Sequence, residues 1–91
     1  MAYNNEQVQD LFNAAADEDM RFKVMSDGIT DYFGNNAAAA LDAVLAVEEA
    51  DVRFYDVYGD YVGSAVILPG LDEGEQIADC SSWVEAWVEA N

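Results

Sequence analysis

The stretch that most constrains the fold is a pair of β-type runs over residues 52–58 and 61–68, joined at Gly59-Asp60. The second run is almost continuously apolar, which is typical of a strand that is centrally placed or covered on both faces. Pro69-Gly70 follows and ends the run, because proline cannot donate a backbone hydrogen bond to a sheet. The sequence therefore predicts a hairpin over residues 52–68 at the centre of a β-sheet.

A second hairpin is predicted nearer the N-terminus, where residues 21–26 and 29–33 flank Asp27-Gly28. This dipeptide suits a type I′ turn, because both central residues of such a turn need positive φ. Pairing across the turn places Phe33 on the core face, but it places Asp31 on that face as well. A bulge or a frayed edge in the second strand would remove this conflict.

Three segments with helical periodicity alternate with these strands. Apolar residues three and four positions apart predict a first helix that ends at an acidic triplet, and an alanine-rich run predicts a second over residues 37–50. A short strand over 76–80 and a last helix, opened by Ser82 and Glu85 as a capping box, complete the chain. The predicted order is α-β-β-α-β-β-β-α. It describes one α+β domain over residues 1–91, with helices packed on a mainly antiparallel sheet.

The reactive side chains exclude several kinds of chemistry. The chain has no histidine, and Cys80 is its only cysteine, so an internal disulfide, a thiolate zinc site and imidazole acid–base catalysis are excluded. No acid-rich segment has the spacing of an EF-hand loop, and no carboxylate pair shows the contrast in environment that glycoside hydrolysis requires. We therefore expect a non-enzymatic protein with no catalytic residues, no cofactor and no bound metal.

Charge is the feature of the sequence that bears most directly on function. Asp and Glu number 19 against 3 Lys and Arg, a formal net charge of −16, while 53% of the residues are hydrophobic, more than disordered acidic chains carry. Such a chain is repelled by nucleic acids and anionic membranes and is attracted to basic protein surfaces. No apolar run is long enough to span a bilayer, and the N-terminus lacks an apolar signal core. We therefore expect a cytoplasmic protein that contacts neither nucleic acid nor membrane directly.

The acidic residues fall in clusters, and we expect these clusters to form the surface that binds a basic partner. The residues expected there are Asp17, Glu18, Asp19, Glu48, Glu49, Asp51, Asp56, Asp60, Asp72, Glu73, Glu75 and Asp79. The first three are carboxylates at the end of a helix, where they oppose the macrodipole and lower stability. The sequence leaves open whether the protein acts as a monomer or as a homodimer.

Two functions are consistent with this charge. Duplex DNA carries one charge per ~1.7 Å of axis, and a folded surface imitates that spacing only with many fixed carboxylates and few interrupting cations. The first hypothesis is therefore a nucleic-acid mimic that occupies the basic site of a nucleic-acid-binding host protein. The alternative is an acidic interaction or structural domain without mimicry, in which the excess acid keeps the protein hydrated, as in salt adaptation.

Three short segments resemble small acidic phage and prophage proteins. They are residues 56–63, Asp-Val-Tyr-Gly-Asp-Tyr-Val-Gly; residues 68–70, Leu-Pro-Gly; and residues 75–81, Glu-Gln-Ile-Ala-Asp-Cys-Ser. In size and acidity the chain is also similar to phage-encoded DNA mimics of the anti-restriction and anti-CRISPR kind. That resemblance implies a stoichiometric inhibitor of a host nuclease or surveillance complex, acting in the host cell cytoplasm. It covers no motif from which the role of an individual residue is carried over.

Overall fold

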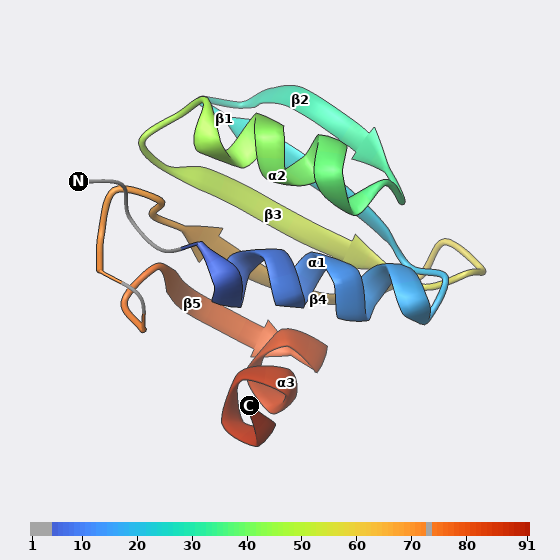
Figure 1. The fold of residues 1–91 in the computed structure, drawn as a ribbon. Coiled ribbons are helices and arrows are strands. Elements are labelled where there is room, and N and C mark those ends of the chain that lie inside the picture. The colour runs from blue at the N-terminus through green and yellow to red at the C-terminus, as the bar shows by residue number, and fades with distance from the viewer. Residues whose placement is uncertain (1–4, 73) are drawn as a thin grey trace.

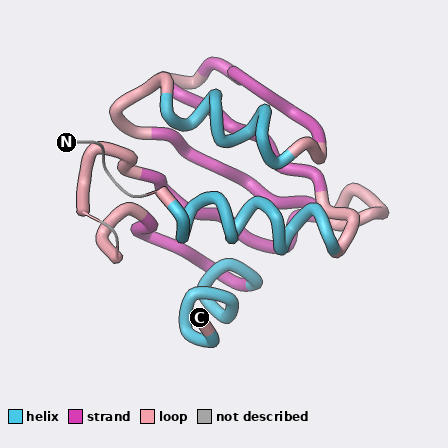
Figure 2. Tube along the Cα trace, viewed as in Figure 1, coloured by secondary structure: helices cyan, strands magenta, loops and turns pink. Residues whose placement is uncertain are grey.

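A computed structural model describes residues 5–72 and 74–91 of the chain. Within these ranges the elements follow the predicted order α-β-β-α-β-β-β-α (Figures 1 and 2). Their bounds are α1 (Glu6–Asp17), β1 (Arg21–Ser26), β2 (Ile29–Gly34), α2 (Ala37–Leu45), β3 (Ala50–Tyr55), β4 (Tyr61–Ile67), β5 (Ile77–Ser82) and α3 (Trp83–Ala90). The structure confirms a small α+β fold in which helices pack on an antiparallel sheet.

The strands form one sheet in the order β2-β1-β3-β4-β5, and every neighbouring pair is antiparallel. β3 is the middle strand and pairs with β4 across the turn at residues 56–60, so the hairpin predicted over 52–68 is central, as expected. The Asp27-Gly28 turn also forms as predicted, with φ of 50° and 77° at its two residues. Local turn chemistry therefore accounts for both hairpins.

The helices cover one face of the sheet and leave the other open in the described part of the chain (Figure 1). Phe12 of α1 meets Phe22 of β1 and Phe54 of β3, with ring centroids 5.1 and 6.0 Å from Phe12. Trp83, at the start of α3, lies 5.8 Å from Phe54, so α3 packs on the same face as α1. Because side chains alternate along a strand, the neighbours of these inward residues point to the open face.

The pairing of β2 with β1 contains the bulge that removes the conflict at Asp31. Val24 pairs with Tyr32 while Met25 pairs with Thr30, so Asp31 is an extra residue on β2. Its carboxylate accepts a hydrogen bond from the Ser26 hydroxyl at 2.6 Å. The expectation that Phe33 faces the core was wrong, because the bulge reverses the facing of the residues beyond it. Phe33 pairs with Lys23 and is 54% exposed on the open face.

The helix ends differ from the sequence expectations at two places. α2 ends at Leu45, well before Ala50, because Ala50 is buried as the first residue of β3 and the chain must turn to reach it. Asn36 caps α2, and its side-chain oxygen accepts a hydrogen bond from the Ala39 amide at 3.0 Å. The prediction of a capping box at Ser82 was wrong. Ser82 has φ of 54° and ψ of −125°, and its side chain makes no cap hydrogen bond.

Gly63 is a position where β4 closely approaches the end of β5 and the start of α3. A Cβ added at Gly63 would lie 2.8 Å from the Ser81 carbonyl oxygen and 3.1 Å from the amide nitrogens of Trp83 and Val84. All three are backbone atoms, which cannot rotate away as a side-chain end can. The missing side chain of Gly63 is therefore what lets α3 dock on the sheet.

Gly63→Ala should lower the free energy of unfolding by about 1–3 kcal/mol, as overpacking in a rigid site does. Urea denaturation followed by circular dichroism measures this difference. Gly70→Ala is the matched control, since a Cβ at Gly70 meets nothing within 4 Å, and a surface change of this kind stays within about 0.5 kcal/mol. Equal effects of the two substitutions would contradict the close approach at Gly63.

Candidate interaction surfaces

Most of the acidic residues predicted to contact a partner are exposed. The exposed ones are Asp17, Glu18, Asp19, Glu48, Glu49, Asp60, Asp72, Glu75 and Asp79. Asp51 and Asp56 are half-buried, and Glu73 lies outside the described residues. Among the described residues no group of three or more acidic or cysteine side chains is arranged to hold a metal ion.

The fold places these residues at two opposite ends of the sheet, because they lie near opposite ends of its strands (Figure 1). One end carries Asp17, Glu18 and Asp19 at the C-terminal end of α1, and Asp56 and Asp60 in the β3–β4 turn. The other end carries Glu48 and Glu49 before β3, Asp51 as the second residue of β3, and Asp72 and Glu75 in the β4–β5 loop. The predicted set is therefore two acidic ends, with Asp79 on the edge strand β5.

Two of these carboxylates are engaged in holding the fold together. One oxygen of Asp56, Oδ1, accepts from the backbone amides of Tyr58 and Asp60, both at 2.9 Å, and so stabilises the β3–β4 turn. Oε2 of Glu18 accepts from the indole Nε1 of Trp83 at 3.2 Å and links the end of α1 to α3. Sequence clustering did not distinguish these structural carboxylates from the others.

The end of α1 holds Asp19 in the left-handed region, with φ of 58°. The Met20 amide donates to the Ala15 carbonyl and the Asp19 amide to the Ala16 carbonyl, both at 3.0 Å, as in a Schellman motif. Glycine is preferred at this position because it has no Cβ to clash. Asp19 therefore adds a conformational cost to the electrostatic cost of a negative charge at a helix C-terminus.

Replacing Asp19 should stabilise the protein. Asp19→Asn removes the charge and keeps a residue that tolerates positive φ, a gain of about 0.3–1 kcal/mol, and Asp19→Gly should add roughly 0.5 kcal/mol more. Chemical denaturation at neutral pH tests both variants. Asp10→Asn removes the same charge from the first half of α1 and should not stabilise, so an equal gain there would contradict the role of the helix end.

A third acidic surface lies on the helical side of the domain, and of its residues only Asp17 and Glu18 were among the predicted site residues. This acidic helical face consists of the exposed carboxylates of the helices and their ends: Glu6, Asp10, Asp17, Glu18, Asp42, Glu85 and Glu89. A groove lined by Glu6, Gln7, Asp10, Gly74, Trp87 and Asn91 runs between α1 and α3. Spacings of four residues, as between Glu85 and Glu89, are the sequence signal that reveals this face.

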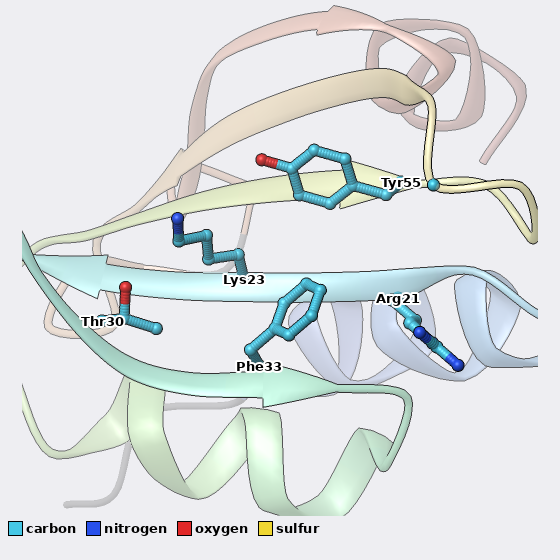
Figure 3. Close-up of a pocket in the computed structure, with 6 residues that line it drawn as sticks. Arg21, Lys23, Thr30, Phe33 and Tyr55 are labelled. Carbon is cyan, nitrogen blue, oxygen red and sulfur yellow. The ribbon is translucent and has the colours of Figure 1, made fainter.

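All three side-chain cations of the sequence lie on the open face of the sheet, and we call this set the basic sheet face: Arg21, Lys23 and Arg53 (Figure 3 shows the first two). Lys23 and Arg53 are direct cross-strand neighbours on β1 and β3, an arrangement of like charges that disfavours pairing. In the described part of the chain no carboxylate lies within 4.0 Å of any of the three cationic groups. The basic sheet face is therefore a cluster of cations without ion pairs among the described residues, within a strongly acidic protein.

Next to Arg53 the open face carries a closed set of three hydroxyl groups. The Tyr61 hydroxyl donates to Ser64 Oγ at 2.9 Å and lies 3.1 Å from Ser81 Oγ, and the two serine oxygens are 3.0 Å apart. Hydrogen bonds with Ser64 and then Ser81 hold the pKa of the Tyr61 phenol below its ordinary value of 10.0, and the charge of Arg53 acts in the same direction.

A shallow hollow of about 380 Å³ opens on this face beside the cations (Figure 3). Its lining consists of Arg21, Lys23, Thr30, Phe33, Tyr55 and Gly59. In Figure 3 the Phe33 ring stands between the side chains of Lys23 and Arg21, with Tyr55 across from it on β3. Cationic, hydroxyl and aromatic groups thus meet in one concave place.

Comparisons of the chain with protein-family models, with curated proteins and with solved structures find no match. Among the residues that the structure describes, there is also no helix with the length and apolar character needed to cross a membrane. The feature of the molecule that bears most directly on function is therefore the distribution of charge over the fold. Negative charge lies on the acidic helical face and at the adjoining ends of the sheet, and positive charge lies on the basic sheet face opposite.

Raising the NaCl concentration through the physiological range should raise the Tm, because screening weakens repulsion among the clustered carboxylates. Calorimetric melting at several salt concentrations measures the trend. A flat or falling series would show that the carboxylates are already neutralised. A very large gain that needs molar KCl would favour salt adaptation over a surface kept acidic for a partner.

Proposed function

We propose that this protein is a non-enzymatic, stoichiometric inhibitor whose acidic surface occupies the nucleic-acid-binding site of a basic host protein. The observation that carries the proposal is the segregation of charge, which leaves the helical side without a single Lys or Arg side chain in the described part of the chain. A basic groove that docks on that side meets only carboxylates and neutral groups. The few cations of the sequence do not interrupt it.

The charge density also supports mimicry. The domain is 40 Å long and carries a net charge of −16, which is about one negative charge per 2.5 Å of its long axis (16 charges over 40 Å). Duplex DNA carries one per ~1.7 Å. A basic groove that releases counterions when it binds DNA would release them on binding such a surface as well. Steering by the same field makes encounter fast at low salt.

Within this surface we assign contact to the acidic helical face and the adjoining end at residues 17–19. The exposed carboxylates there are held on rigid helices, and the α1 terminus retains three acids at a cost in stability. Glu48 and Glu49 lie at the opposite end of the sheet and belong to a turn after α2. They therefore serve as a comparison set of the same charge.

The test is displacement of labelled duplex DNA from a panel of basic nucleases and CRISPR surveillance complexes at low salt. We expect displacement at stoichiometric concentrations, weakening steeply as salt rises. The double variant Asp10→Asn and Asp17→Asn should lose about 1 kcal/mol of binding free energy, since exposed ion pairs contribute ~0.2–1 kcal/mol each.

The matched control is Glu48→Gln with Glu49→Gln, which removes the same charge from the other end and should leave displacement nearly unchanged. Absence of displacement across the whole panel would overturn mimicry and favour an acidic domain whose charge serves hydration. Equal losses from the two double variants would overturn the assignment to the helical face. Displacement that does not depend on salt would also count against the proposal.

A further inference from the structure

The basic sheet face combines features that the acidic function does not use. Its cations have no carboxylate partner within 4.0 Å in the described residues, although the chain offers a large excess of acids. Cross-strand placement of Lys23 beside Arg53 costs stability that a bound anion would restore. The hollow beside them supplies a second kind of recognition, because Phe33 and Tyr55 line it.

The two rings contact each other edge to face, with centroids 6.1 Å apart and planes at 80°. A planar ligand that stacks on the free face of Phe33 would therefore lie nearly perpendicular to the Tyr55 ring. Phe33 is 54% exposed, which leaves its ring available to a ligand. Phe33 pairs with Lys23 on the neighbouring strand, so the two side chains leave the sheet side by side on the open face.

We propose that this hollow binds a nucleoside monophosphate, with the base stacked on Phe33 against Tyr55 and the phosphate held by Lys23. Arg53 is the cross-strand neighbour of Lys23 and adds positive charge near the phosphate, and Arg21 lines the same hollow on the other side of the Phe33 ring. The Thr30 hydroxyl is a further hydrogen-bonding group in the lining. This site lies on the face opposite the acidic helical face and does not depend on the proposed function.

The size of the hollow and the net charge of the protein favour binding of a small ligand over binding of a nucleic acid strand. A volume of about 380 Å³ is near the lower end of the range for small-molecule sites, roughly 300–1,000 Å³. A long polyanion extends beyond the cations and meets the field of the whole acidic domain. A single phosphate interacts mainly with charges within a screening length of about 8 Å. On this face Asp51, two residues from Arg53, limits the positive region on one side.

The experiment is titration of the full chain with AMP at physiological ionic strength, followed by amide chemical shifts and by calorimetry. We expect saturable binding with shifts confined to β1, β2 and β3, and much weaker binding of adenosine and of inorganic phosphate, each of which offers half of the contacts. Lys23→Gln and Phe33→Thr should each weaken AMP binding roughly tenfold, through the lost charged contact and the lost base stacking.

Gln9→Glu is the matched control for Lys23→Gln. It changes the net charge by the same amount at an exposed position of α1, on the other side of the sheet, and should alter affinity less than about twofold. Melting curves test whether each variant folds. If Phe33→Thr does not fold, the comparison of Lys23→Gln with Gln9→Glu still tests the proposal. Equal affinities of Lys23→Gln and Gln9→Glu, or binding of phosphate as tight as that of AMP, would overturn the proposal. So would tighter binding of an acidic peptide than of AMP.

Discussion

The contact of Phe12 with Phe22 and Phe54 is the interaction on which the rest of the structure depends. It joins α1 to the two strands at the middle of the sheet, and Trp83 extends the same cluster to α3. Burial of large aromatic rings is the main source of stability in a domain this small. Since all three helices contribute buried residues to the core that contains this cluster, the sheet has one covered face and one open face (Figure 1).

Strand alternation then decides where the charges go. With Phe22 inward, its neighbours Arg21 and Lys23 must point outward to the open face, and Arg53 follows from Phe54 by the same rule. The helices carry carboxylates on their outer sides, because their inner sides are used for the core. One packing choice therefore yields a basic patch and an acidic surface on opposite sides of one small domain.

The charge distribution is maintained at a measurable cost. Asp19 occupies a position that favours glycine, three carboxylates end a helix whose dipole disfavours them, and Lys23 stands opposite Arg53. Costs of this kind concentrate at places that bind partners, since folding alone would select against them. The two proposals assign one partner class to each side of the domain, a basic protein to the helical side and a small aromatic anion to the open face.

The sequence by itself determined the element order, both hairpins and the stripe of α1 that is buried, because turn dipeptides and apolar spacing act over a few residues. Tertiary structure decided the rest. The bulge at Asp31 turned Phe33 outward, and the Ala50 pairing with Ile67 ended α2 early, since strand register is a contact between distant segments. The gathering of Arg21, Lys23 and Arg53 likewise needed the pairing of β1 with β3, which no local pattern encodes.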